Sequence, residues 1–328
     1  MVFFGIDISK LTFDVSALIE TKACHKKFAN TETGFKEFKQ WIKTFESEHY
    51  FCMEATGIYG VCLAQYLIQQ NYKTIVANPF IIKSYSRMQM NRNKTDKADS
   101  FCIASYCKNL YLEENIDANL YKPKSKYYQQ LQSLVTRLEQ VKLLKNQEVN
   151  HLESSLDKTV VKIITQSIGS LDRQIKAIKT AIKKCVKKDE TLRKHVQLLV
   201  TIKGIGDLTA WSILAYLGDI SLFLTSAQVA SFVGLNPCVE TSGTSINKTS
   251  LSKSGNKRLR KALYMPAIVA KKHNPILAEF YDRLIKKGKP KKIAICAVMR
   301  KLLVLSFGVL KSETAFNPNY LKEKASQY

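Results

Sequence analysis

The sequence predicts an α/β N-terminal domain with a ribonuclease-H-like sheet, a coiled-coil middle of long helices, and a mostly α-helical C-terminal domain. Three observations predict this order. Short apolar or alternating runs fill residues 1–123, leucine and isoleucine recur every three or four positions over 124–188, and longer apolar helical patterns dominate 189–328. We expect these three ranges to be the domains.

The N-terminal domain has the element order of a mixed sheet. Three strand candidates follow one another directly, and helices and strands then alternate along the chain. The expected strands are residues 2–8, 12–18, 24–28, 50–53 and 73–77, and the expected helices are 34–45, 61–70, 80–90 and 96–107. This order favours a ribonuclease-H-like domain, and a generic doubly wound domain is the alternative.

The middle of the chain has the pattern of two long amphipathic helices. Leu131, Leu134 and Leu138 begin a series with Lys, Glu and Gln between the apolar positions, and the series resumes at Leu171 after a predicted break at 167–170. Such helices can form an antiparallel pair within one chain or an intermolecular coiled coil that makes a dimer. The residues alone leave both arrangements open.

Two features mark the C-terminal domain. The segment TIKGIGDLTA (201–210) predicts a helix–hairpin–helix, in which Gly204 and Gly206 let the backbone approach closely and the next helix offers its amides to a DNA phosphate. An ordinary glycine-containing connection between helices is the alternative. The elements expected after it are a polar loop at 241–256, a basic helix at 257–272 and an apolar helix at 293–310.

Charge indicates a polyanionic partner. The chain has 51 basic and 27 acidic residues, a formal net charge of +24 and a pI near 9.6. The excess is uneven, because residues 1–123 carry 15 basic and 13 acidic side chains whereas 251–328 carry 18 and 4. This distribution predicts that the N-terminal domain carries the catalytic acids and that the C-terminal part of the chain binds phosphates. A basic surface that only keeps the protein soluble is the alternative.

Cysteine usage and hydropathy restrict the class of protein. The eight cysteines include no CxxC pair, which argues against a zinc site, and most lie in apolar runs, as expected of free thiols in a reducing compartment. No uncharged apolar run is long enough for a transmembrane helix, and the first residues do not resemble a signal peptide. We expect a cytoplasmic, nucleoid-associated protein that has no membrane partner.

Four acidic residues are placed for metal binding. Asp7 ends the first predicted strand and Glu54 ends the fourth, while Asp96 and Asp99 are three apart and share one face of a helix. Carboxylates that converge in this way repel each other unless a cation neutralises them, and hard oxygen ligands select Mg²⁺ or Mn²⁺. Two such ions can activate an attacking oxygen and stabilise a leaving oxygen at a phosphodiester. Capping or solvation is the alternative for the helical pair.

Basic side chains lie beside both candidate reaction centres. Lys94 and Lys97 flank the helical acids and could hold a phosphate near the metal. In the C-terminal loop, serines precede a basic helix, and a hydroxyl that attacks phosphorus needs such cations to stabilise the oxyanion. The candidate serines are Ser242, Ser245, Ser250, Ser252 and Ser254, and the candidate phosphate contacts are Lys253, Lys257, Arg258, Arg260 and Lys261. The residues do not show which serine reacts, and solvated hydroxyls are the alternative.

Five motifs occur in an order that resembles one family. GIDISK, MEATGIYG, NRNKTDKADS, IKGIGDLTA and GLNP…TSG…SKSGNKRLRKALYMPA are together similar to the transposases of bridge-RNA-guided insertion sequences, over nearly the whole chain. That family combines a RuvC-like DEDD domain, a coiled coil and a serine-bearing domain. The resemblance puts the DEDD set on Asp7, Glu54, Asp96 and Asp99, and the serine on Ser242. Lys203 departs from the proline that is usual before Gly-x-Gly.

The resemblance implies a mechanism and partners that spacing cannot show. It implies that DNA strands are cut and rejoined through a phosphoserine, with carboxylate-bound Mg²⁺ assisting, in a homo-oligomer (dimer or tetramer) with composite sites. It also implies a structured bridge RNA that pairs with target and donor DNA. The residues themselves leave two other functions open: a metal-dependent RuvC-like endonuclease that cuts DNA with water, and a nucleic-acid-binding protein without catalysis.

Overall fold

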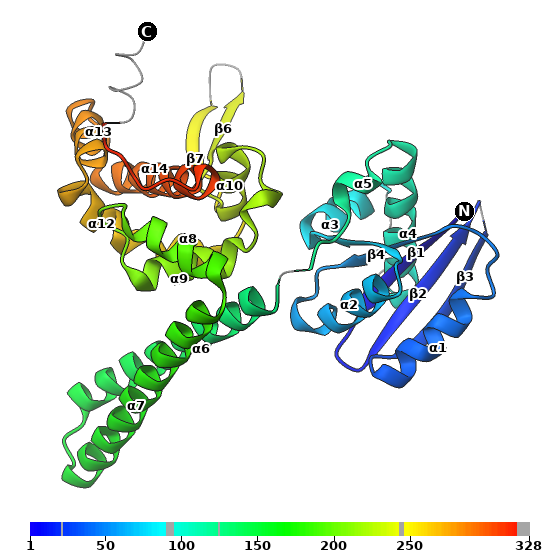
Figure 1. Cartoon of the computed structure of the whole chain (residues 1–328), viewed down its shortest axis with the longest axis horizontal. Helices are drawn as coiled ribbons and strands as arrows, with labels where there is room; N and C mark the ends of the chain where they lie inside the picture. The colour runs from blue at the N-terminus through cyan, green and yellow to red at the C-terminus, as the bar shows by residue number, and fades with distance from the viewer. Residues whose placement is uncertain (21, 90–94, 124, 243–245, 320–328) are drawn as a thin grey trace. The chain divides into compact units, whose positions relative to one another are not determined.

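The structure, a computed structural model, describes residues 1–20, 22–89, 95–123, 125–242 and 246–319, with the backbone alone at 58, 239–242 and 246–249. The chain divides into two compact units, Met1–Pro123 and Lys124–Tyr328, and each is described by itself (Figure 1). The first unit is mixed α/β and the second is mostly helical, which confirms the predicted fold class at this level.

The N-terminal unit is built on one five-stranded sheet. Its strands are β1 (Val2–Ile8), β2 (Thr12–Ile19), β3 (Lys22–Ala29), β4 (His49–Glu54) and β5 (Lys73–Ala77). Their order is β3-β2-β1-β4-β5, with β2 antiparallel to both β1 and β3 and with β4 parallel to both β1 and β5. Because β1 and β4 are parallel, their C-terminal ends meet at one edge of the sheet. The topology is consistent with a ribonuclease-H-like domain.

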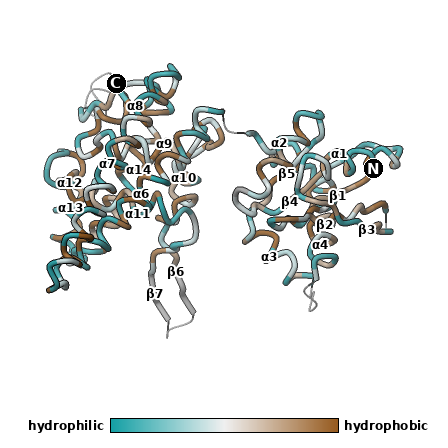
Figure 2. The backbone as a smooth tube through the Cα atoms, turned by 90° about the horizontal axis from the view of Figure 1, so that it is seen from below, coloured by the Kyte–Doolittle hydropathy of each residue, from teal (hydrophilic) through white to brown (hydrophobic). Residues whose placement is uncertain are grey.

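Helices cover both faces of this sheet. They are α1 (Glu32–Ile42), η1 (Gly57–Tyr59), α2 (Val61–Gln69), α3 (Pro79–Met88), α4 (Asp96–Leu112) and α5 (Ile116–Asn119). α1 and α2 lie on one face, over an aromatic core in which the rings of Phe4 and Phe51 stack with centroids 4.7 Å apart. α4 lies on the other face, with α3 packed against it. Figure 2 shows hydrophobic residues concentrated along the central strands.

The C-terminal unit begins with a long helical hairpin. Its two helices are α6 (Lys126–Ser154) and α7 (Lys158–Lys188). They pack antiparallel along each other, and an ion pair of 2.6 Å joins Lys145 of α6 to Asp172 of α7. The antiparallel pair within one chain is therefore present, and a coiled coil between chains stays a prediction.

The turn of this hairpin differs from the predicted position. The expected break at 167–170 is wrong, because these residues lie inside α7. The turn precedes Thr159 instead, where the Asp157 side chain accepts hydrogen bonds of 2.9 Å from the amides of Thr159 and Val160 and so begins α7. Gly169, which suggested the break, lies in the helix interior, where glycine costs only about 1 kcal/mol relative to alanine.

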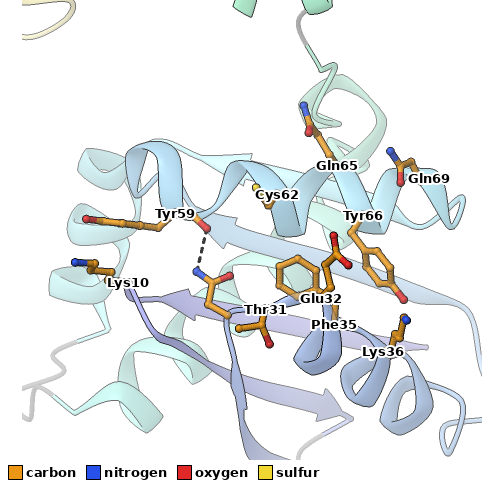
Figure 3. A pocket seen from close by; sticks show the side chains of 11 residues that line it. Lys10, Thr31, Glu32, Phe35, Lys36, Tyr59, Cys62, Gln65, Tyr66 and Gln69 are labelled. Carbon is orange, nitrogen blue, oxygen red and sulfur yellow. Dashed lines mark hydrogen bonds between the residues drawn. The ribbon is translucent and has the colours of Figure 1, made fainter. Parts of the chain in front are cut away.

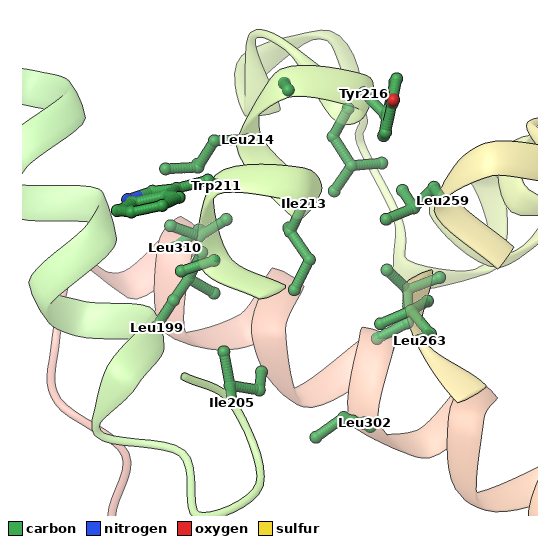
Figure 4. Close-up of a cluster of buried hydrophobic side chains, with 14 of the residues drawn as sticks. Leu199, Ile205, Trp211, Ile213, Leu214, Tyr216, Leu259, Leu263, Leu302 and Leu310 are labelled. Carbon is green, nitrogen blue, oxygen red and sulfur yellow. The ribbon is translucent and has the colours of Figure 1, made fainter. Parts of the chain in front are cut away.

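The rest of the C-terminal unit is a helical body with one two-stranded hairpin. Its elements are α8 (Glu190–Val200), α9 (Asp207–Leu217), η2 (Ile220–Leu222), α10 (Ser226–Val233), β6 (Pro237–Ser242), β7 (Ile246–Leu251), α11 (Lys257–Ala262), α12 (Tyr264–His273), α13 (Pro275–Lys286) and α14 (Lys291–Ser312). α9 lies at the centre of the core, with apolar side chains of α8, α11 and α14 packed around it (Figure 4).

Two C-terminal elements differ from their sequence-based expectations. The predicted loop at 241–256 contains parts of the antiparallel strands β6 and β7, which sequence patterning missed because they lack an alternation of apolar and polar residues. The predicted helix at 257–272 is divided into α11 and α12. Pro266 has no amide hydrogen to donate to the carbonyl oxygen of Ala262, which explains the division.

One helix has the length and composition of a membrane span. α14 is 22 residues long, and the apolar window within it has a mean hydropathy of 2.1. Its buried side chains, among them Val298, Leu302 and Leu303, belong to the core of the C-terminal unit. A core helix passes the same test of length and composition, so α14 is no evidence of a membrane protein.

Candidate active site

Strand alternation brings two of the predicted acids to one face of the sheet. In β1, Phe4 and Ile6 belong to the core under α1 and α2, so Gly5 and Asp7 point to the face that α4 covers. In β4, the residue before Glu54 likewise belongs to the core under α1 and α2, so Glu54 also points to the α4 face. Both acids therefore lie at the same edge and on the same face.

Gly5 lets α4 lie directly on β1. A Cβ atom at Gly5 would be 2.1 Å from both the amide nitrogen of Ala104 and the carbonyl oxygen of Ser100, so any side chain here would push α4 away. The Ser100 hydroxyl also makes a buried hydrogen bond of 2.8 Å with the hydroxyl of Ser16 in β2. This close packing holds the first turn of α4, which carries both helical acids, beside β1.

The four predicted acids share one electrostatic environment. Burial raises the pKa of Asp7 from 3.8 to about 6, and the negative charges of Asp99, Asp96, Glu54 and Asp14 contribute to the rise in that order. Hard carboxylate oxygens under mutual repulsion are the donor set that suits a divalent cation. Among the residues that the structure describes, however, no three Asp, Glu, His or Cys side chains form a ready-made metal cage. The acids fit a site that a cation would draw together.

Sequence reasoning missed a fifth acid, Asp14, and its partners. The β1–β2 register puts Asp14 opposite Asp7, and Asp14 is only 6% exposed. The ammonium of Lys27 lies 3.1 Å from Asp14 Oδ2 and 3.4 Å from Asp96 Oδ2, so it bridges the sheet and α4. Nε2 of His25 lies 3.1 Å from Asp14 Oδ1 without hydrogen-bond alignment. A charge inside the apolar run TFDVSALI was the signal that could have found Asp14.

Replacing Lys27 by methionine is expected to tighten Mn²⁺ binding about three- to tenfold, because a cation that repels the metal and occupies Asp96 is removed. The same variant should unfold at a lower temperature in EDTA, since Asp14 loses a partner inside the sheet. Calorimetric Mn²⁺ titration and thermal melts test the two effects. Lys26→Met, one residue away on β3, is the control. Equal or weaker Mn²⁺ binding by the Lys27 variant would contradict the competition.

The predicted serine lies at the end of a strand. Ser242 is the last residue of β6, and its register partner in β7 is Ile246. Only its backbone belongs to the described residues, and Ser245 lies outside them. Ser252 and Ser254 follow β7 and are exposed.

Two glycines hold the base of this hairpin against the helical body. Gly234 (φ +72°) ends α10 and Gly255 (φ +133°) precedes α11, and both have a backbone conformation that favours glycine. A Cβ atom on Gly255 would be 2.5 Å from the carbonyl oxygen of Phe232 and 2.8 Å from the amide nitrogen of Gly234. The amide of Asn256 donates to Phe232 O at 2.8 Å. The motifs GLNP and SKSGN therefore pack against each other at the base of β6 and β7, and we call this pair of segments, with Gly234 and Gly255, the clamp.

The predicted phosphate contacts fall into three groups. Lys97 on α4, Lys253 before α11, and Lys257 on α11 are exposed. Two others already have protein partners, because Arg260 donates to Val233 O at 2.7 Å and Arg258 lies 3.9 Å from Glu139 of α6. Lys261 on α11 belongs with the first group, because it is exposed. The third group is Lys94 alone, which lies outside the described residues.

The glycine segment TIKGIGDLTA connects α8 to α9. Gly204 has φ +107° and lies against Ala270 of α12, where a Cβ atom would be 2.5 Å from the alanine methyl. Gly206 caps α9 without any side-chain hydrogen bond, and nothing lies within 4 Å of its Cβ position. The first part of the connector is thus used in packing, while the start of α9 is open at Gly206. The role of this segment in DNA binding stays a prediction.

A mixed sheet with four acids at one edge, in a chain whose C-terminal unit is basic, is typical of an enzyme that acts on nucleic acid. Residues 4–161 match the family described as Transposase of the DEDD IS110 type, and residues 196–282 match the Transposase IS116/IS110/IS902 family. The chain belongs to the IS110/IS116 family of transposases. It is a DNA recombinase, and its DEDD domain indicates dependence on a divalent metal.

Several proteins are similar to this chain along different shares of its length. The pilin gene-inverting proteins of Moraxella bovis and Moraxella lacunata are each 34% identical to it, over 96% of this chain and 97% of theirs. The transposase for insertion sequence element IS1328 of Yersinia enterocolitica is 30% identical over 50% of each chain. The likeness to the gene-inverting proteins therefore includes both units.

Proposed function

We propose that this chain cuts and rejoins DNA strands through a phosphoserine at Ser242, with Mg²⁺ or Mn²⁺ held by Asp7, Glu54, Asp96 and Asp99. The observation that carries the metal site is geometric: Asp7 and Glu54 end parallel strands on the face that α4 covers, and the first turn of α4, with Asp96 and Asp99, packs beside β1. The charges of the other three acids contribute to the raised pKa of Asp7, which supports the same placement. Acids gathered in a DNA-acting enzyme repel phosphate unless a cation is bound. The metal would supply Lewis-acid stabilisation of charge on the phosphodiester oxygens.

The serine step conserves the energy of the phosphodiester bond. Ser242 Oγ loses its proton and attacks phosphorus, the Oγ–P bond forms as the P–O bond to the leaving strand breaks, and the freed strand oxygen takes up a proton. Attack by a strand hydroxyl on the phosphoserine then rejoins DNA and releases the serine. Lys257 and Lys261, exposed on α11 directly after the hairpin, are our candidates for stabilising the phosphorane oxygens.

The proposal includes target DNA, donor DNA, a structured bridge RNA and further copies of this chain. Residues 251–328, with 18 basic and 4 acidic side chains, supply the charge that several nucleic acids need, and binding should weaken steeply with salt. The α6–α7 hairpin is the candidate interface for a dimer or tetramer. In that assembly the acids of one copy would act together with Ser242 of another.

One assay tests the chemistry and the RNA together. The protein is incubated with Mg²⁺, with RNA transcribed from the DNA that flanks its gene, and with a suicide DNA substrate, and then run on a denaturing gel. We expect a denaturation-resistant protein–DNA adduct that needs all three additions. Cutting without an adduct would support the hydrolytic endonuclease, and binding without cutting would support a non-catalytic protein. An adduct formed without RNA would remove the guide from the proposal.

A second candidate function is inversion of a DNA segment between two sites in one molecule. The likeness to two pilin gene-inverting proteins along nearly the whole chain favours it. Inversion and insertion can share the same strand chemistry, so the two differ in the arrangement of the recombined sites. A plasmid that carries the element's junctions in inverted orientation, scored for flipping and for loss of the element, distinguishes them.

A further inference from the structure

A pocket of about 560 Å³ lies in the N-terminal unit on the sheet face opposite α4. It is formed between the start of α1, the segment η1, and α2 (Figure 3). Figure 3 shows Tyr59 and Lys10 together at one end of the pocket and Tyr66 and Lys36 at the other. The volume lies within the ~300–1,000 Å³ of sites that hold small organic groups. The proposed chemistry at the acids and at Ser242 does not use this pocket.

One end of the pocket lies at the same sheet edge as the carboxylates. Lys10 follows β1 three residues after Asp7, and Tyr59 follows β4 five residues after Glu54. The side-chain amide of Asn30, directly after β3, donates to the carbonyl oxygen of Tyr59 at 3.1 Å and also holds the turn after β1. The acids and the pocket therefore lie on the two sides of one edge, where connected segments carry both.

The walls of the pocket suit a planar heteroaromatic ring with a polar rim. Tyr59 is 41% exposed and lines one end of the pocket, while Phe35 and Tyr66, with ring centroids 5.5 Å apart, supply an apolar wall. Among the described residues, no side-chain hydrogen bond is found for the amide of Gln65, and the Glu32 carboxylate belongs to the same lining. Amides and carboxylates are the groups that pair with base edges.

We propose that this pocket holds one unpaired nucleobase of the DNA strand whose phosphate lies at the acidic edge. Stacking on Tyr59 would supply affinity, Gln65 and Glu32 would meet the polar rim of the base, and Lys10, at the Tyr59 end of the pocket, would face the backbone. A base turned into the pocket would fix the register of the strand at the edge. The inference rests on DNA reaching the acids, as in the proposed function, but not on Ser242.

The test is a binding cycle on the full-length protein in Ca²⁺, with fluorescently labelled single-stranded DNA that carries an abasic site at one position after another. Tyr59→Ala should weaken binding about tenfold, within the range for loss of one base stack, whereas Tyr59→Phe keeps the ring and should bind as the native chain does. At one position of the DNA, the abasic site should lower the affinity of the native chain. The same abasic site should leave the affinity of the Tyr59→Ala variant unchanged.

Three outcomes would overturn the inference. They are native affinity in Tyr59→Ala, equal losses from the abasic site in both proteins at every position, and coupling that appears with RNA but not with DNA. A thermal melt shows whether Tyr59→Ala is folded, and Gln65→Ala repeats the cycle from another wall. Because adduct formation is scored separately, loss of the Ser242 chemistry would leave this binding cycle intact, and loss of the coupling would leave the adduct.

Discussion

Asp7→Asn is expected to reduce DNA strand cleavage about a thousandfold or more while leaving DNA binding in place. Asp7 lies where the charges of Asp99, Asp96 and Glu54 converge, so the substitution replaces the central anionic ligand of the proposed metal site with a neutral amide. Cleavage of a labelled junction substrate in Mg²⁺ measures the effect. Asp117→Asn, exposed on α5 of the same unit, is the matched control. Near-native cleavage by the Asp7 variant would remove the metal site from the proposal.

The same Asp7→Asn variant should be more stable than the native chain without metal. The pKa of Asp7 is raised in the folded state, so folding penalises the ionised carboxyl. The penalty is absent below about pH 4, grows as the pH rises from 3.8 to about 6, and is complete above that. A rise of this size corresponds to at most about 3 kcal/mol, and partial exposure screens it to about 1–2 kcal/mol.

Thermal melts in EDTA test this pH dependence. We expect Tm of Asp7→Asn to exceed the native value by a few degrees at pH 8 and to equal it near pH 4. A difference of the same size at both pH values would show that the effect is not electrostatic. Addition of Mn²⁺ at pH 8 should stabilise the native chain more than the variant.

Ser242→Ala is expected to abolish the covalent protein–DNA adduct and to reduce strand exchange below detection. No other group at this position can form the Oγ–P bond, so the loss should be complete rather than graded. Ser252→Ala, on the exposed segment that follows β7, should keep full adduct formation. Persistence of the adduct in Ser242→Ala would move the nucleophile to another residue, and peptide mapping of the adduct would then identify it.

The acidic edge could be predicted from the sequence because it depends on local patterns. Asp7 and Glu54 end apolar runs, and Asp96 and Asp99 are three apart behind the capping residue Thr95. The Asp14–Lys27 pair could not be predicted in the same way, since it depends on the register of β2 with its neighbours. Pairing across a sheet is set by the tertiary structure, and one sequence carries only weak information about it.

The pocket between α1 and α2 and the polar hairpin β6–β7 escaped prediction for different reasons. The pocket collects residues from α1, α2 and the ends of two strands, so no single segment shows it. β6 and β7 have hydroxyl, acidic, basic and amide side chains where a half-buried strand would have apolar ones, and their pattern is that of a loop. These strands are held at their base by contacts of Gly234 with Ser254 and Gly255, which are about twenty positions away in the sequence.

The clamp formed by Gly234 and Gly255 sets a rule for building hybrid recombinases. The two glycines lie against each other through backbone atoms. A β6–β7 segment taken from a relative should therefore fold correctly only when the glycine-containing segments on both sides of it are exchanged as well. Exchanging residues 232–256 would transfer both glycines together with the strands. Exchanging residues 237–251 alone would join the strands of a relative to the glycine contacts of this chain. The boundaries for exchanging Ser242, the proposed nucleophile, between relatives are therefore fixed by glycine contacts outside the strands β6 and β7.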